Sequence, residues 1–166
     1  MTIDVCNDAV RMALEETQKK CGASNLDQVV KGLKEGNGCY HGYFRFYLML
    51  HVLECLASKI RGLRAIYMFG STMDGSPDIT SDINLLLYVS KKDPKIKKTM
   101  EGLNTMLTDN YRELLNLKTK DCFRLLDLHY VTDKDIKSHS SAAAMLGSIH
   151  DPPMLIWKSG KGVCKA

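Results

Sequence analysis

The pattern of apolar residues changes at Gly62, and this change constrains the fold more than any other feature of the sequence. Before Gly62, apolar side chains recur every three or four residues, which predicts amphipathic helices over residues 3–21, 25–33 and 39–61. After Gly62, short apolar runs of strand length alternate with longer helical patterns. Three helices followed by alternating strands and helices predict an α/β (α+β) fold, with helices packed on a mixed sheet.

The second part of the chain divides into predicted strands and helices at clear breaks. Strands are expected over residues 63–69, 82–90, 122–131 and 154–157, and helices over 93–114 and 132–147. Residues 70–81 are rich in Gly, Ser, Thr and Asp, which predicts a loop with at most a helical turn. The Gly- and Lys-containing tail is expected to be loose. We therefore expect an N-terminal helical extension, residues 1–62, and a core domain, residues 63–166.

Composition excludes several protein classes. The chain has 166 residues, 45% of them apolar and 25% charged, and a net charge of +4, which is ordinary globular usage and argues against disorder. Its six cysteines are at least 15 residues apart and form no CxxC pair, so we expect free thiols rather than a zinc site or a disulfide framework. The sequence shows neither a signal peptide nor an apolar run of about 20 residues, which predicts a cytoplasmic protein without membrane contact.

The residues with the most chemical content lie around the predicted 70–81 loop. Gly70 and Ser71 follow a strand, where a missing side chain lets backbone amides approach a phosphate and a hydroxyl can bind it. Asp82 and Asn84 are two residues apart on the next strand, so they share a face. Asp127 is an acid on an otherwise apolar later strand. Three oxygen-bearing side chains beside a phosphate-binding turn suit a hard cation such as Mg²⁺.

The order Gly70-Ser71, ten residues, Asp82-x-Asn84 resembles the Gly-Ser-x10-Asp-x-Asp signature of the nucleotidyltransferase-fold (DNA polymerase beta-like) superfamily, and of its small, minimal members in particular. Asp127 matches the third carboxylate of that family, and the resemblance covers residues 63–157. It implies a nucleotidyltransferase-type sheet. It also implies that Gly70 and Ser71 bind the phosphates of a nucleoside triphosphate such as ATP. Asp82, Asn84 and Asp127 would hold Mg²⁺, with Asp82 and Asp127 catalytic and Asp127 the general base.

Two residues depart from the family pattern. Asn84 stands in place of the second Asp and lacks its negative charge. A unit charge ~4 Å from a cation is worth on the order of 4 kcal/mol at an effective dielectric of about 20, or roughly a thousandfold in metal affinity. Asp74 stands where such loops commonly carry a basic residue, and an acid there would repel a triphosphate. Asp78 is expected to be a solvated loop acid, and His129 a hydrogen-bonded strand histidine.

Three interpretations of Asn84 stay open: a natural change that leaves binding without catalysis, a change that Asp82 and Asp127 tolerate, or an introduced Asp→Asn replacement. The leading hypothesis is a transferase that moves a nucleoside monophosphate to a hydroxyl group. The acceptor would belong to a partner protein, in an antitoxin-like role, to an RNA end or to a small molecule. The alternative is a catalytically inactive module that binds nucleotide or protein. A lysine cluster over residues 91–98 would suit RNA, and the N-terminal helices would suit a homo-oligomer.

Overall fold

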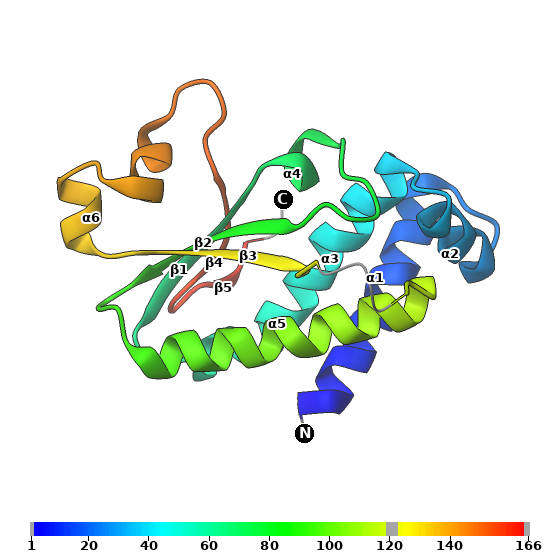
Figure 1. The fold of residues 1–166 in the computed structure, drawn as a ribbon, viewed down its shortest axis with the longest axis horizontal. Helices are drawn as coiled ribbons and strands as arrows, with labels where there is room; N and C mark the ends of the chain where they lie inside the picture. Colours follow the sequence, from blue (N-terminus) through cyan, green and yellow to red (C-terminus); the bar gives the residue numbers. More distant parts are fainter. Residues whose placement is uncertain (1, 119–122, 165–166) are drawn as a thin grey trace.

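A computed structural model describes residues 2–118 and 123–164, which form a five-stranded sheet with helices packed against it (Figure 1). The strand order is β3-β2-β1-β4-β5. The β2–β3 pair is parallel, and the β1–β2, β1–β4 and β4–β5 pairs are antiparallel. The predicted α/β architecture, with N-terminal helices and a mixed sheet, is confirmed.

Three helices come first, as the sequence predicts: α1 (Thr2–Cys21), α2 (Leu26–Lys34) and α3 (Gly38–Leu56). The side chain of Asn25 caps α2 by accepting the N–H of Gln28 at 2.9 Å, and the side chain of Asn37 caps α3. The third helix is shorter than the predicted 39–61 segment. It gives way to a 3-10 turn, η1 (Ala57–Lys59), and Gly62 then turns the chain with φ +91°.

The strands are β1 (Leu63–Phe69), β2 (Ile83–Val89), β3 (Leu126–Val131), β4 (Met154–Lys158) and β5 (Gly162–Val163). The prediction that the 122–131 segment is one strand was wrong for residues 123–125, and residue 122 lies outside the described residues. The predicted loose tail is also wrong for residues 162–163, because β5 pairs with β4 as a short hairpin.

The two faces of the sheet are covered differently. Ile83 and Leu85 of β2 belong to the large hydrophobic core, which also contains residues of α1, α3 and α5 (Pro94–Leu115). Leu86, which alternates with them, belongs instead to a small cluster with Val131 and Ala143. Figure 1 shows α5 below the strands and the segment near residue 140 above them. One face is therefore closed by long helices, and the opposite face is only partly covered.

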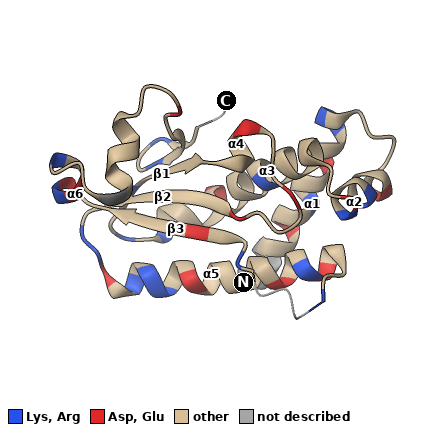
Figure 2. Ribbon diagram, turned by 45° about the horizontal axis from the view of Figure 1, so that its top comes forward, with Lys and Arg blue, Asp and Glu red and all other residues tan. Residues whose placement is uncertain are grey.

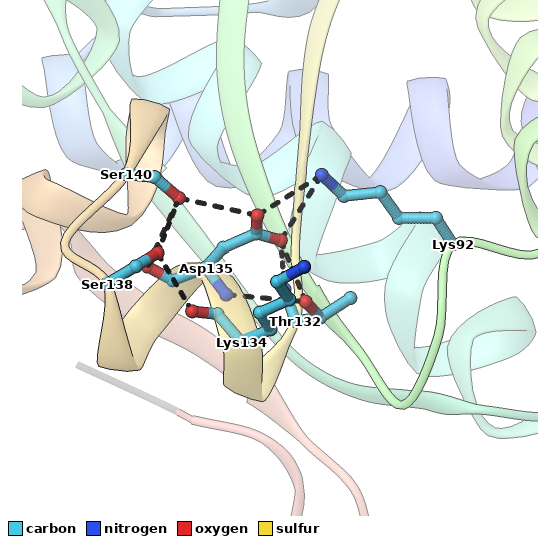
Figure 3. A network of polar contacts seen from close by, with 6 residues as sticks. All are labelled: Lys92, Thr132, Lys134, Asp135, Ser138 and Ser140. Carbon is cyan, nitrogen blue, oxygen red and sulfur yellow. Dashed lines mark hydrogen bonds and ion pairs between the residues drawn. The ribbon is translucent and has the colours of Figure 1, made fainter.

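The predicted helix over residues 132–147 is two short pieces, α6 (Asp133–Lys137) and the 3-10 segment η2 (Ser141–Gly147). Figure 3 shows Asp135 at the centre of the network that anchors α6. Its carboxylate accepts the N–H and hydroxyl of Thr132 at 2.9 and 2.8 Å and pairs with Lys92 at 3.2 Å. The hydrogen bonds from Thr132 lower the pKa of Asp135 to about 2. The chain leaves the helical conformation at His139, where φ is 49°.

The large core contains residues from both sides of position 62, from Cys6 in α1 to Trp157 in β4. The division into an extension of residues 1–62 and a domain of residues 63–166 stays a prediction. No helix in the described parts of the chain has both the length and the apolar character needed to cross a bilayer.

Candidate functional site

Gly70 forms a sharp turn at the end of β1. Its backbone has φ 76° and ψ −158°, a conformation that is essentially restricted to glycine. A Cβ at this position would lie 2.8 Å from Nδ2 of Asn84, so the turn also needs a residue without a side chain. The short helix α4 (Ser71–Asp74) begins immediately afterwards and ends at Gly75, which has a left-handed conformation. The predicted helical turn in the loop is present, and it places Ser71 directly after the end of β1, an interior strand of the sheet.

Asn84 lies between the other predicted site residues. It is directly opposite Phe69 of β1 on one side and Asp127 of β3 on the other. Its Nδ2–H donates a hydrogen bond of 3.2 Å to Oδ1 of Asp82. The strand pairing puts Asn84 and Asp127 side by side on the face of the sheet that the long helices leave open. Two carboxylates and one amide thus gather next to the Gly70 turn.

Asp127 has a second partner on β3. Nε2 of His129, two residues further on, lies 2.9 Å from Oδ2 of Asp127, and the His129 ring is 5.6 Å from that of Phe69. The side chains of Asp127 and His129 are 45% and 37% exposed, so a solute can reach both. The expected hydrogen-bonded strand histidine is present, and it faces the acid. Together the two groups can accept and hold a proton at the surface of the sheet.

Arg45 of α3 holds the loop that leads to Asp82. It is fully buried, and its guanidinium donates hydrogen bonds to the carbonyl groups of Ser81, Asp78 and Ile79, the last two at 2.7 and 3.2 Å. The hydroxyl of Tyr111 accepts from the same guanidinium at 2.9 Å. Its single hydrogen is shared between the carbonyl of Ile79 and Nδ1 of His41, both 3.1 Å away. A buried cation surrounded by backbone oxygens fixes the path of this loop. Arg45 therefore sets the position from which β2 and Asp82 start.

His41 extends this buried network toward α2. Its Nε2–H donates to the carbonyl of Leu33 at 2.8 Å, and its Nδ1 lies 3.1 Å from the Tyr111 hydroxyl. Burial, and secondarily the charge of Arg45, lowers the pKa of His41 to about 4. His41 is consequently neutral at pH 7 and serves as a buried hydrogen-bonding link, not as a proton donor to the site. The His41 side chain is buried completely.

The two acids of the loop are engaged locally. Oδ1 of Asp78 accepts the backbone N–H groups of Thr80 and Ser81, both at 2.8 Å, and these hydrogen bonds together with those from the two hydroxyls lower its pKa. Oδ1 of Asp74 accepts the N–H and the hydroxyl of Ser76 at 3.2 and 2.6 Å. Both carboxylates shape turns of the loop. This agrees with the interpretation of Asp78 as a loop acid rather than a ligand.

Within residues 2–118 and 123–164, no group of three or more His, Cys, Asp or Glu side chains is arranged to hold a metal ion. The donor set that the structure does bring together is Asp82, Asn84 and Asp127, which includes an amide. Oxygen atoms of carboxylates and amides are the ligands that Mg²⁺ accepts, so the chemistry of this set fits a hard divalent cation. Asn84 contributes the one neutral donor of this set.

The lysine cluster of residues 91–98 lies in a different place. Together with η1 it lines a groove of about 1040 Å³ between the β1–β2 end of the sheet and α5. Figure 2 shows basic residues in the loop before α5 and along its first turns. Apolar side chains line this groove together with one acid, Asp93, and five cations: Lys59, Arg61, Lys91, Lys95 and Lys98. Asn84 and Asp127 are not among the residues that line it.

The sequence pattern identified Gly70, Ser71, Asp82, Asn84 and Asp127. The structure places Gly70 and Ser71 just after the end of β1, and Asp82 just before β2. Asn84 of β2 and Asp127 of β3 lie opposite each other. The sequence pattern did not identify Arg45 or the role of Tyr111. The single signal for Arg45 was a cation within an apolar, aromatic helix, which indicates a buried charge with partners elsewhere in the chain.

The comparisons with known proteins add one structural likeness. The structure is similar to a crystal structure described as a "putative nucleotidyltransferase from Sulfolobus solfataricus". The TM-score is 0.45 with 16% sequence identity, over 78% of this chain and 95% of that one. No protein-family model matches the chain, and no curated protein matches it.

Proposed function

We propose that the chain is a metal-dependent nucleotidyltransferase of the DNA polymerase beta-like fold. It would move a nucleoside monophosphate from a nucleoside triphosphate, ATP first among them, to a hydroxyl group in the cytoplasm. The acceptor would be a partner protein, an RNA end or a small molecule. The observation that carries the proposal is the meeting of the Gly70 turn with Asp82, Asn84 and Asp127 across three adjacent strands. A phosphate-binding turn beside carboxylates at an open sheet face is what phosphoryl transfer requires.

The residues of this chain have distinct roles in the proposal. The Ser71 hydroxyl and the backbone N–H groups at the start of α4 bind phosphate oxygens, which Gly70 allows to approach closely. Asp127 accepts the proton of the attacking hydroxyl at Oδ1, the oxygen that does not face His129. His129 holds Oδ2 and orients the carboxylate. Arg45 keeps the loop before Asp82 in place.

Asp82, Asn84 and Asp127 would hold the metal ion. When bound, a divalent cation neutralises the negative charge that develops on the phosphates and on the departing pyrophosphate. Asn84 offers this ion a neutral amide oxygen in place of a charged one, and its NH₂ group faces Asp82. The site therefore binds the cation more weakly than one with three carboxylates.

The alternative is a catalytically inactive module of the same fold that binds nucleotide or protein. The observation that favours it is the hydrogen bond from Asn84 to Asp82, which satisfies the acid without a cation. Tyr43 of α3, 38% exposed, is one residue through which such a module would contact a partner or a second copy of the chain.

A titration tests the transferase hypothesis against the inactive-module hypothesis. Mg²⁺-ATP, and then the other nucleoside triphosphates, are titrated into the protein and its Asn84→Asp variant. Binding is followed by calorimetry, and pyrophosphate release is measured in parallel with a hydroxyl-bearing acceptor or water. The transferase proposal expects Mg²⁺-dependent binding in both proteins and release that rises at least tenfold in the variant. Asp127→Asn should abolish release, whereas Asp109→Asn, an exposed acid on α5, should not change it.

The outcomes separate the hypotheses. Binding without release in either protein would support the inactive module. Release in both proteins at similar rates would mean that Asp82 and Asp127 suffice. Absence of Mg²⁺-dependent nucleotide binding in both would refute the transferase proposal and leave a partner protein as the ligand to look for.

A further inference from the structure

Two cysteines that are 18 positions apart in the sequence lie next to each other in space. Cys21 is the last residue of α1, and Cys39 lies in the first turn of α3. Their sulfur atoms are 3.8 Å apart, which is van der Waals contact. Cys39 is exposed and Cys21 is partly buried. The pairing was not expected from the sequence, because spacing alone does not show that the ends of two helices meet.

We propose that Cys21 and Cys39 form a reversible disulfide bond by exchange with a low-molecular-weight disulfide such as glutathione disulfide. The two sulfurs need to move about 1.8 Å closer to reach the bond length of about 2.0 Å, which is within the range of side-chain rotation. The other described cysteines have no such neighbour. Cys6 is buried in the core, and Cys55 and Cys164 have no sulfur within contact distance in the described parts of the chain.

The exchange proceeds in two balanced steps. The thiolate of Cys39 attacks one sulfur of the small disulfide, whose S–S bond breaks, and one small thiol leaves with a proton from solvent. The thiolate of Cys21 then attacks Sγ of Cys39 and releases the second small thiol. Two protein thiols are oxidised, one small disulfide is reduced to two thiols, and the two electrons pass between them. An excess of the reduced thiol reverses both steps.

The surroundings of the pair set the order of attack. Burial, the hydrogen bond with Cys39 and the charge of Cys39 raise the pKa of Cys21 to about 11. The exposed Cys39 is therefore the residue that meets the small disulfide first. After Cys39 is capped as a mixed disulfide, the contact between the two sulfur atoms places Cys21 beside the sulfur that it attacks.

The bond would join α1 to α3 at a point that adjoins the candidate site. A Cβ at Gly38, the residue before Cys39, would be only 3.1 Å from the carbonyl oxygen of Gly75 and 3.5 Å from that of Pro77. The start of α3 and the loop after α4 are thus in close backbone contact. Closing residues 21–39 by a covalent link restricts the unfolded chain and stabilises this corner of the fold.

The test uses the full chain, incubated with reduced glutathione or with glutathione disulfide and then alkylated to count free thiols. Oxidation should remove two of the six thiols, and mass spectrometry of a non-reduced digest should show the Cys21–Cys39 peptide pair. The melting temperature should rise by roughly 6–12 °C and return when dithiothreitol is added. Cys55→Ser, which removes an exposed cysteine, should leave all three results unchanged.

Cys39→Ser and, separately, Cys39→Ala should each remove the shift in melting temperature and the linked peptide. Both variants change an exposed side chain, and circular dichroism shows whether they fold as the parent does. The proposal would be overturned if six thiols remained free after oxidation, if the linked peptides contained other cysteines, or if the Cys39 variants gained the same thermal shift. None of these readouts depends on nucleotide binding, so the result is independent of the proposed function.

Discussion

At Gly70 a single missing side chain determines whether the turn and the sheet can meet. We expect Gly70→Ala to destabilise the fold by about 2–3 kcal/mol, because alanine is strained at φ 76° and its Cβ would press on the Asn84 amide at 2.8 Å. Urea unfolding measures the change. Gly102→Ala is the matched control, because an alanine Cβ in the exposed middle of α5 meets nothing within 4 Å. That variant should gain about 0.5–1 kcal/mol, and equal effects at the two positions would contradict the interpretation of Gly70.

The lowered pKa of the buried His41 should make the stability of the fold depend on pH. Its pKa is about 4 in the folded protein and about 6.5 in the unfolded chain, so the unfolded state takes up a proton first as the pH falls. Stability is therefore lost between pH 6.5 and pH 4, by about 2 kcal/mol at pH 5. His41→Gln, which keeps a donor for the Leu33 carbonyl, should be less stable at pH 7 and lose less between pH 7 and pH 5. The same pH slope in both proteins would show that other groups cause it.

Sequence reasoning found the residues of the site whose geometry is local. A strand period of two predicted that Asp82 and Asn84 lie on one side. Asp82 in fact directly precedes β2, and its side chain accepts a hydrogen bond from Asn84. Arg45 was not found because its partners, the carbonyl groups of residues 78–81, lie more than 30 positions away. Backbone carbonyls carry no sequence signature, so a side chain that binds them cannot be recognised before the fold is known.

At the scale of elements, the loop between β1 and β2 depends on α3 for its shape. Arg45→Met should destabilise the protein by about 2–4 kcal/mol, because it leaves three carbonyl groups and the Tyr111 hydroxyl without their buried donor. Arg45→Lys should recover only part of this loss, because one ammonium group cannot reproduce a planar fork.

Arg45→Met should loosen the loop between β1 and β2 locally, in addition to lowering the stability of the whole protein. Hydrogen exchange of the backbone amides of residues 78–83 should accelerate in Arg45→Met more than exchange in α5 does. The exposed Arg61 supplies the control, since Arg61→Met should change stability by less than about 0.5 kcal/mol. Uniform acceleration across the chain would mean that Arg45 supports the core and not this loop.

Helices and strands were predictable where a capping residue or a clear run of apolar residues marks their bounds. The helix α5 begins at Pro94 after the Asp93 cap, and β1 has the predicted bounds. The predicted helix over residues 132–147 failed because serines near His139 bind the backbone of α6. The Ser138 hydroxyl donates to the Lys134 carbonyl at 2.9 Å and accepts from the Ser140 hydroxyl, 3.0 Å away. Such local bonds compete with a continuing helix, and periodicity alone does not reveal them.

At the scale of the whole molecule, two regions of different chemistry are separated. The candidate site with its acids occupies the open face near the start of β2, and the cations lie in the groove between η1 and α5. The five cations and Asp93 give the groove a local charge of +4, which equals the net charge of the whole chain, so the remaining charges balance one another. This separation allows the groove to attract a polyanion without competing with a nucleotide.

The groove leads to a prediction about nucleic acid. We expect weak binding of a single-stranded RNA oligonucleotide, measured by fluorescence anisotropy, with an affinity that falls as salt rises. Replacement of Lys91, Lys95 and Lys98 by Gln should flatten the plot of log affinity against log salt by about two, since each neutralised phosphate contributes about 0.7 for a single strand. The control replaces Lys19, Lys20 and Lys31, exposed lysines of α1 and α2, and should keep the parent slope. Equal slopes for the two triple variants would place RNA binding elsewhere on the molecule. Absence of binding at low salt would leave a partner protein or a small molecule as the acceptor that the proposed transferase modifies.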